Sequence, residues 1–147
     1  MIRLAAFKIE RFVGTWKLVS FETRTEDGTV SYPFGKNALG YIMYSIDGYM
    51  SVALLPKKRR KFKTQDILGG TIEDKVAAAE SFISYFGRYK VRGKKVIHLV
   101  EISFFPNWVG VDQERSFRFD ENKLILSAKP MLINGKSQSV NLIWEKI

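Results

Sequence analysis

The residue types that could carry chemistry gather in one stretch, between positions 96 and 119. His98 is the only histidine of the chain, and Gln113 and Arg115 follow it after a bend. Residues two apart on a strand share a face, so His98 shares a face with aliphatic neighbours, and Gln113 and Arg115 share one with phenylalanines. Polar side chains on otherwise apolar faces predict a polar cluster inside an apolar, small-molecule pocket.

Two of these side chains have competing interpretations. A single histidine among aliphatic residues is more often a hydrogen-bonded core residue than a catalyst, yet the intrinsic pKa of an imidazole suits ligand contact or proton transfer. His98 is therefore the one catalytic candidate. A guanidinium buried at Arg115 needs a partner, because an uncompensated buried charge is costly. That partner is an internal carboxylate, an aromatic ring or an acidic ligand.

The remaining ligand-contact candidates are mostly aromatic. Tyr44, Tyr85 and Tyr89 can present hydroxyls to a ligand, or they are ordinary barrel residues with hydroxyls at a rim. Asn107 and Trp108 lie in the bend Pro-Asn-Trp-Val-Gly. An exposed aromatic residue in a bend is more often functional than one in a core, but Trp108 would equally suit a hydrophobic plug under the loop.

Hydrolysis and metal chemistry find no support in the sequence. There is no cysteine and no nucleophile-elbow pattern, and any serine triad would have to use the single histidine of the chain. A zinc ion would have to rely on scattered carboxylates, which are poor sole ligands for it. We expect no metal and no cofactor.

Most of the chain alternates with the period of a β-strand. The first expected strand begins at Gly14, with Trp16, Leu18 and Ser20 on one face and Phe21 on the other. Asp47-Gly48 and Asn134-Gly135 are hairpin signals. The later expected strands are residues 39–45, 49–55, 85–91, 96–104, 113–120, 123–128 and 138–145. About eight strands in up-and-down order predict an all-β, closed antiparallel barrel, which leaves no sheet edge exposed.

Two helical segments accompany these strands. Residues 4–12 have apolar side chains at helical spacing and are expected to form a short helical turn that acts as a lid or plug. A second helix is expected over about residues 72–84. Thr71 is its cap and Asp74 completes a capping box. The apolar stripe of this helix predicts that it lies against the barrel.

Length and composition indicate one globular domain over residues 1–147. The chain is 46% hydrophobic, and no apolar run approaches the roughly 18 residues of a membrane span. The N-terminal sequence MIRLAAFKIERF meets charged residues before an export signal could form, so we expect a cytoplasmic protein.

The formal charge of +9 is concentrated in the segment PKKRRKFK, residues 56–63. A solvated loop that discourages edge pairing is the prevailing interpretation of such a block. The alternatives are a nucleic-acid contact, an anionic-membrane contact or a nuclear-import-like signal. Only one aromatic residue interrupts the block, so base stacking has little support. The basic residues concerned are Lys57, Lys58, Arg59, Arg60 and Lys61.

An ordered set of short motifs resembles the bacterial and fungal lipocalin-like domain family. The motifs are Gly14-Thr15-Trp16, Tyr32-Pro33-Phe34-Gly35, Gly40-Tyr41, Asp47-Gly48-Tyr49-Met50-Ser51, Tyr85-Phe86-Gly87 with Tyr89, Phe105-Pro106-Asn107-Trp108-Val109-Gly110 with Arg115, and Trp144-Glu145. The resemblance runs from about Gly14 to the C-terminus. It implies an eight-stranded barrel with an internal pocket, in a family whose members mostly lack a defined activity.

The resemblance also bears on individual residues. It implies that Trp16 marks the base of the barrel, with Arg115 stacked on its ring as one of the three solutions above. Trp144, from the last motif, joins the expected ligand-contacting residues.

The leading hypothesis is a non-catalytic protein that binds a small, mostly hydrophobic molecule inside the barrel. A carboxylate or carbonyl of the ligand would be oriented by Arg115, His98 or a tyrosine. One alternative is an isomerase or cyclase acting on a hydrophobic substrate in the same pocket, which rests on fold-level analogy. A second alternative is an inert barrel whose basic segment contacts nucleic acid or an anionic membrane. The ligand, the choice between binding and catalysis, and the oligomeric state stay open at this level.

Overall fold

The computed structural model of the chain describes residues 8–147, with residues 8–12 in a short helical segment. The elements that follow are β1 (Gly14–Thr25), β2 (Val30–Ser31), β3 (Leu39–Tyr44), β4 (Tyr49–Leu55), α2 (Ile72–Ala79), β5 (Ile83–Arg92), β6 (Lys95–Ser103), the 3-10 turn η1 (Pro106–Trp108), β7 (Asp112–Asp120), β8 (Lys123–Ile133) and β9 (Lys136–Lys146). Strands therefore dominate, as the alternating sequence predicts.

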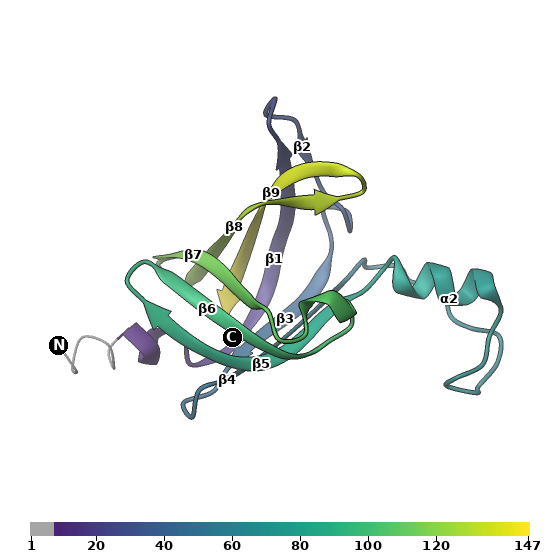
Figure 1. The fold of residues 1–147 in the computed structure, drawn as a ribbon, viewed down its shortest axis with the longest axis horizontal. Helices are drawn as coiled ribbons and strands as arrows, with labels where there is room; N and C mark the ends of the chain where they lie inside the picture. Colours follow the sequence, from purple (N-terminus) through teal and green to yellow (C-terminus); the bar gives the residue numbers. More distant parts are fainter. Residues whose placement is uncertain (1–7) are drawn as a thin grey trace.

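The sheet closes on itself. Each long strand pairs with the next one along the chain in antiparallel fashion, and β1 pairs with both β3 and β9. The closing register runs from Trp16 opposite Lys146 to Thr25 opposite Gln138. Eight long strands thus form a barrel, while the two-residue β2 only extends the hairpin after β1 (Figure 1). The predicted all-β, eight-stranded antiparallel barrel is confirmed.

Bulges change which side chains face the interior. On β1 the register shifts between Leu18 and Ser20. A bulge adds one residue and reverses the alternation beyond it, so Phe21 is buried on the same side as Trp16 and Leu18. The expectation that Phe21 faces away from those residues was wrong for this reason.

The two predicted hairpin turns differ in backbone conformation. Asn134 and Gly135 both have positive φ, 51° and 77°, as a primed two-residue turn requires. In the other hairpin only Gly48 has positive φ, 94°. The Asn-Gly turn follows a strand that continues to Ile133, past an irregularity after Ala128, so β8 is longer than predicted.

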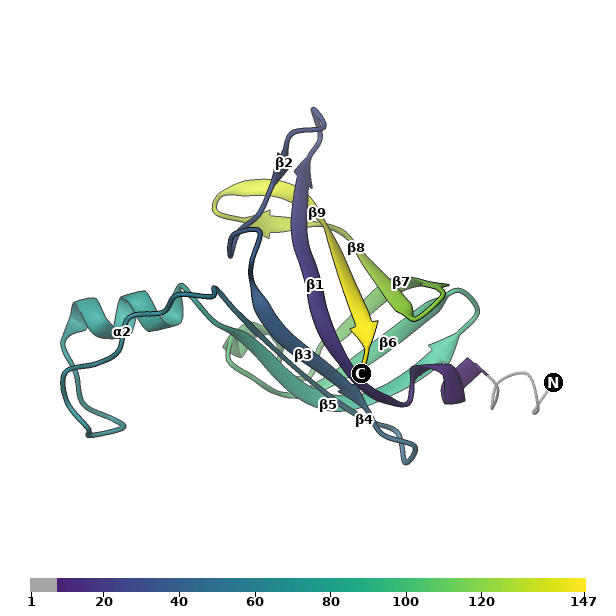
Figure 2. The same ribbon diagram turned by 180° about the vertical axis from the view of Figure 1, so that it is seen from behind.

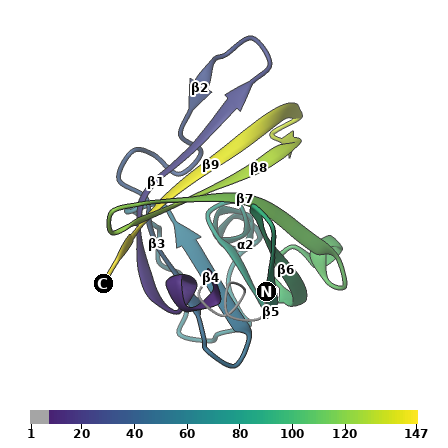
Figure 3. The ribbon, with the colours of Figure 1, turned by 90° about the vertical axis from the view of Figure 1, so that its left-hand side faces the viewer.

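An aromatic plug fills one end of the barrel, which we call the base. The Phe12 ring is fully buried and meets the rings of Tyr44, Phe117 and Phe119 edge to face, at centroid distances of 5.2, 4.8 and 5.0 Å. Seen from that end, the short N-terminal helix lies across the strands (Figure 3). The described part of the N-terminal segment therefore acts as a plug; its predicted beginning, at Leu4, lies outside the described residues.

Helix α2 projects from the barrel at the end opposite the base (Figures 1 and 2). The capping box is present: the Thr71 hydroxyl accepts from the Asp74 N–H at 3.1 Å, and the Asp74 carboxylate accepts from the Thr71 N–H at 3.3 Å. The predicted extent to residue 84 and the packing against the barrel were wrong. Ile83 pairs with Leu54 in the sheet, so the helix ends early, and Ile72 stays 79% exposed.

Candidate functional site

The interior above the aromatic plug is hollow. A cavity of about 310 Å³ lies between the strands, which we call the barrel cavity. Most of its wall is apolar, and its polar lining comes chiefly from β5, β6, β7 and β9. The lining residues include Phe21, Ile42, Val52, Leu126, Val140 and Leu142, together with the polar groups described below. A cavity of this size and character is typical of a small-molecule site.

His98 lies at the wall of the barrel cavity between two tyrosines. Its Nε2 atom is 2.7 Å from the Tyr44 hydroxyl and its Nδ1 atom is 2.7 Å from the Tyr85 hydroxyl. Tyr85 comes from the neighbouring strand, whereas Tyr44 reaches across from β3. A neutral imidazole has one donor and one acceptor nitrogen, so one tyrosine donates to the ring and the other accepts from it.

Burial keeps all three of these groups uncharged at neutral pH. His98 is only 1% exposed, and desolvation, helped by the positive charge of Arg115, lowers its pKa to about 3. Desolvation likewise raises the pKa of Tyr44 and of Tyr85, and Arg115 opposes that rise. Desolvation always disfavours the charged form, so the trio is a neutral hydrogen-bonding unit.

Arg115 is the buried charge of this wall, since the other charged lining residue, Glu80, is exposed. Arg115 is 8% exposed and lines the barrel cavity. One terminal nitrogen donates to the Gln113 side-chain oxygen at 3.2 Å and the other donates to the Glu114 backbone carbonyl at 2.9 Å. No carboxylate within residues 8–147 forms an ion pair with it. Its positive charge is therefore hydrogen-bonded but not neutralised by the described protein.

Two further polar atoms in the cavity wall have no partner among the described residues. They are the indole nitrogen of Trp144, which is completely buried, and the hydroxyl of Ser103. An indole N–H can only donate. The wall therefore offers a buried indole donor without an acceptor in the described chain, beside a guanidinium that is hydrogen-bonded but has no carboxylate partner there.

Trp108 covers part of the cavity mouth. Its ring is half-buried and meets the ring of Tyr85 edge to face at 5.7 Å, and the ring of Phe105 at 5.6 Å. The side chains of Tyr85, Phe105 and Trp108 all line the barrel cavity, whereas that of Asn107 is exposed and outside the lining. The bend therefore places an aromatic lid residue beside the Tyr85 and His98 pair.

The remaining predicted residues lie away from the cavity. Tyr89 is buried, and its hydroxyl donates to the Ser45 carbonyl at 2.7 Å, so it stabilises the turn between β3 and β4. Trp16 donates from its ring nitrogen to the Phe12 carbonyl at 2.8 Å. The cation over the Trp16 ring is the Lys146 ammonium, at 4.7 Å, rather than the guanidinium of Arg115 that the family resemblance implied.

Sequence reasoning missed two cavity residues because of bulges. Ser103 shares strand parity with exposed Glu101, but the register shift opposite Phe86 and Gly87 turns it into the cavity. Phe21 enters the cavity through the bulge on β1. A bulge is set by how two strands pair in the folded sheet, so a single sequence carries no reliable mark of it.

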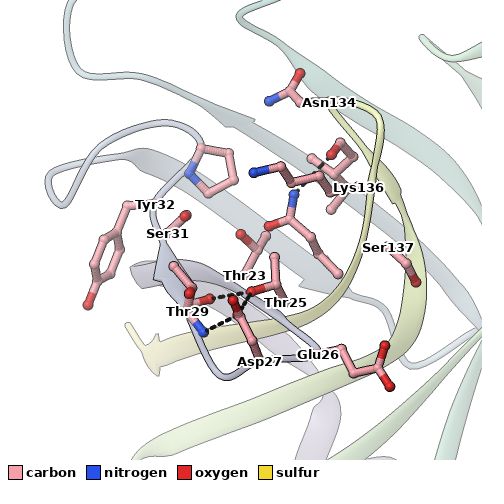
Figure 4. A pocket seen from close by; sticks show the side chains of 13 residues that line it. Thr23, Thr25, Glu26, Asp27, Thr29, Ser31, Tyr32, Asn134, Lys136 and Ser137 are labelled. Atoms are coloured by element: carbon pink, nitrogen blue, oxygen red, sulfur yellow. Dashed lines mark hydrogen bonds between the residues drawn. The ribbon is translucent and has the colours of Figure 1, made fainter.

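A second hollow lies on the surface beside the β1–β2 hairpin and the β8–β9 turn (Figure 4). It is wide, open and polar, at about 910 Å³. Its carboxylate at Asp27 accepts from the Thr25 hydroxyl and from the Thr29 N–H, and these bonds lower the pKa of Asp27 to about 2. Because that carboxylate is engaged in the turn itself, we favour the barrel cavity as the site.

The basic segment divides into engaged and solvated residues. Arg59 donates to the Ala78 carbonyl at 3.0 Å, and Arg60 pairs with Asp74 at 2.9 Å. Lys57, Lys58 and Lys61 are exposed and form no ion pair with any residue between 8 and 147. In that same part of the chain, no three metal-ligating side chains gather and no helix is long and apolar enough to cross a membrane.

A closed antiparallel barrel with a buried, mostly apolar cavity is the architecture of lipocalin-type proteins. The chain belongs to the lipocalin-like domain family, whose sequence profile matches residues 13–147. This confirms the family resemblance. Together with the barrel, membership of this family supports ligand binding in general.

Two proteins illustrate the similarity. The 4′-hydroxy-3′-methoxypropiophenone carrier protein of Aspergillus oryzae is 33% identical over 107 residues, an alignment that covers 67% of this chain and 96% of that protein. An uncharacterized protein of known structure from Bacteroides eggerthii is 14% identical, with a TM-score of 0.47 over 92% of this chain and 99% of that one.

Proposed function

We propose that this protein binds one small, mostly hydrophobic molecule in the barrel cavity and holds it by an acceptor oxygen. The observation that carries the proposal is the buried guanidinium of Arg115, which lines an apolar cavity and has no carboxylate partner among residues 8–147. A buried charge without compensation is unfavourable. A ligand carboxylate, phenolate or carbonyl would supply the missing acceptor.

The other polar atoms of the wall support the same ligand class. The Trp144 indole N–H lacks an acceptor within the described chain, and the hydroxyl of Tyr85 is held at the cavity by His98. Polar groups from three strands would orient an oxygen-bearing end, while the apolar wall would bury the remainder of the molecule.

The related carrier protein points in the same direction. Its name describes an aromatic ketone with hydroxyl and methoxy groups, which combines an apolar ring with acceptor oxygens. We therefore place aryl ketones and aromatic acids first among the candidates, followed by fatty acids and isoprenoids.

A thermal-shift screen of the purified protein against these four classes tests the proposal. A ligand at about a hundred times its dissociation constant should add about 2.7 kcal/mol to the free energy of unfolding. For hits with an acidic group, calorimetry should show tighter binding of the acid than of its methyl ester, because Arg115 prefers an anion. If the folded protein shows no thermal shift with any of the four classes, the proposal is refuted.

Two arginine variants distinguish a specific contact between Arg115 and the ligand from a general effect of the protein's charge. Arg115→Met keeps much of the side-chain volume and removes the guanidinium, so the preference for the acid over its ester should disappear. Arg118→Met is the matched control, because Arg118 lies on the same strand with an exposed side chain that pairs with Asp120. Equal loss in both variants would contradict a specific role for Arg115.

An isomerase or cyclase activity is the second candidate, and the His98 trio is the observation that would favour it. The low pKa of His98 makes it a weak base at neutral pH, which weighs against proton abstraction by the imidazole. Mass spectrometry of each hit after incubation tests the difference. Unchanged ligand supports binding, whereas a converted product that is lost in His98→Ala would favour catalysis.

A further inference from the structure

The segment between β4 and β5, residues 56–82, forms an arm that extends beyond the barrel (Figures 1 and 2). Its first half runs alongside α2, because Arg59 bonds to the Ala78 carbonyl and Arg60 to the Asp74 carboxylate. Three of its last residues, Ala79, Glu80 and Phe82, line the barrel cavity. The arm is thus an ordered element anchored at the cavity mouth.

The outer part of the arm exposes aliphatic side chains that no other part of the described chain covers. Ile67, Leu68 and Ile72 are 94%, 83% and 79% exposed, and Val76, one turn further along α2, is also exposed. Scattered single apolar residues on a surface are ordinary, but several within ten positions of one projecting element mark an interaction surface.

The arm that carries this aliphatic surface is also basic. The arm contains seven lysines and arginines against four acidic residues. Two of the basic side chains are engaged within the arm, whereas Lys57, Lys58 and Lys61 are exposed without an ion pair to any described residue. Exposed aliphatic side chains and exposed lysines on one projecting element are the combination that binds an anionic bilayer surface.

We propose that the arm docks the protein reversibly on anionic lipid membranes, with Ile67, Leu68 and Ile72 inserted at the headgroup boundary and the lysines on the headgroups. Docking there would bring the cavity mouth to the bilayer, where hydrophobic small molecules partition. The inference concerns a surface separate from the barrel cavity and does not depend on the ligand proposed above.

Two other occupants fit the surface less well. A nucleic acid would use the lysines but would leave the aliphatic side chains unused, and both phenylalanines of the arm, Phe62 and Phe82, are half-buried rather than presented for stacking. A second copy of the chain, related by a twofold axis, would place the lysines of one arm against those of the other.

Vesicle flotation with the full chain tests the inference. Binding is expected to phosphatidylcholine vesicles that contain phosphatidylglycerol, to weaken with rising salt, and to be far weaker without the anionic lipid. The triple variant Lys57→Gln, Lys58→Gln, Lys61→Gln should weaken binding about 100-fold, at roughly fivefold for each lysine. The triple variant Ile67→Ser, Leu68→Ser, Ile72→Ser should weaken it by about 50-fold, because each side chain is only partly buried at the interface.

Control variants on the barrel match the charge change in full and the aliphatic change at one position. Lys90→Gln, Lys94→Gln, Lys123→Gln removes three exposed lysines of the barrel, and Ile46→Ser removes an exposed aliphatic residue of the β3–β4 turn. Both should bind vesicles as the unmodified protein does. Because the arm stands off the barrel, its variants should also unfold at an unchanged temperature and retain any ligand of the cavity.

Several outcomes would overturn the inference. They are no flotation with anionic vesicles, equal loss in the control lysine variant, and binding that is insensitive to the aliphatic substitutions. Light scattering that shows a dimer which the aliphatic variant dissociates would assign the surface to a second copy. Salt-sensitive binding to nucleic acid without vesicle binding would assign it to that partner instead.

Discussion

Acidification should destabilise this protein through His98 well before its carboxylates are affected. Burial and the nearby Arg115 lower the pKa of His98 from 6.5 to about 3, so below pH 6.5 the unfolded chain binds a proton that the folded protein does not. The stabilisation is fully present above pH 6.5 and is lost as the pH falls toward 3. At about 1.36 kcal/mol per pH unit, the free energy of unfolding should fall by about 2 kcal/mol between pH 7 and pH 5.

Urea unfolding at several pH values measures this loss, and thermal unfolding should show it as a decrease of about 4 to 8 °C between pH 7 and pH 5. Hydrogen bonds keep the pKa values of Asp27, Asp74 and Glu114 below the ordinary carboxyl range, so those groups act only at lower pH. The variant His98→Gln, which retains a donor and an acceptor, should be less stable at pH 7 but should lack the change between pH 7 and pH 5.

The chain has a single histidine, so its ring resonance in a proton–carbon NMR spectrum can be followed without ambiguity. Its chemical shift should stay constant from pH 8 to pH 5 while the protein remains folded. A titration with a midpoint near 6.5, or an equal loss of stability in His98→Gln, would refute the reasoning that the imidazole is buried and neutral between two tyrosines.

Three stability predictions concern the scaffold. Phe12→Ala removes a fully buried ring that meets three other rings and should cost about 3 to 5 kcal/mol in urea unfolding; a loss under about 1 kcal/mol would mean that the plug is not part of the core. Gly87→Ala would place a Cβ atom 2.0 Å from the Leu99 carbonyl oxygen, so the same assay should show a loss of about 3 kcal/mol or more, and a neutral effect would contradict this close approach. Thr71→Ala removes the cap of α2 and should speed hydrogen exchange in residues 72–79 by about fivefold, for about 1 kcal/mol of local stability; a lower urea midpoint for the whole protein would show that the arm is coupled to the barrel.

The strands and the capped start of the helix could be predicted from the sequence because their signals are local. The alternation from Tyr85 to Val91 reports burial on one face, and the Thr71 and Asp74 pair satisfies the first N–H groups of a helix without help from the remainder of the chain. Closure of the sheet also followed from counting strands, since a set of about eight in up-and-down order leaves no edge once it closes.

The polar cluster could be predicted only in part from local sequence patterns. Strand parity placed His98, Gln113 and Arg115 on apolar faces, and His98 does lie directly opposite Gln113 in the sheet. The contact between His98 and Tyr44 joins residues 54 positions apart, and it arises from the curvature of the closed barrel, which no local pattern encodes.

By itself, the sequence determined the fold class, the family and the residues that could form a polar wall, because burial and turn formation act over a few neighbouring residues. Only the tertiary structure decided that Arg115 lies without a carboxylate partner among residues 8–147, that Lys146 rather than Arg115 covers Trp16, and that Ile72 and Val76 of α2 stay exposed. These features depend on bulges, barrel closure and the early end of the helix. Bulges, barrel closure and the end of the helix each depend on contacts between residues far apart in the sequence, so the whole fold determines them.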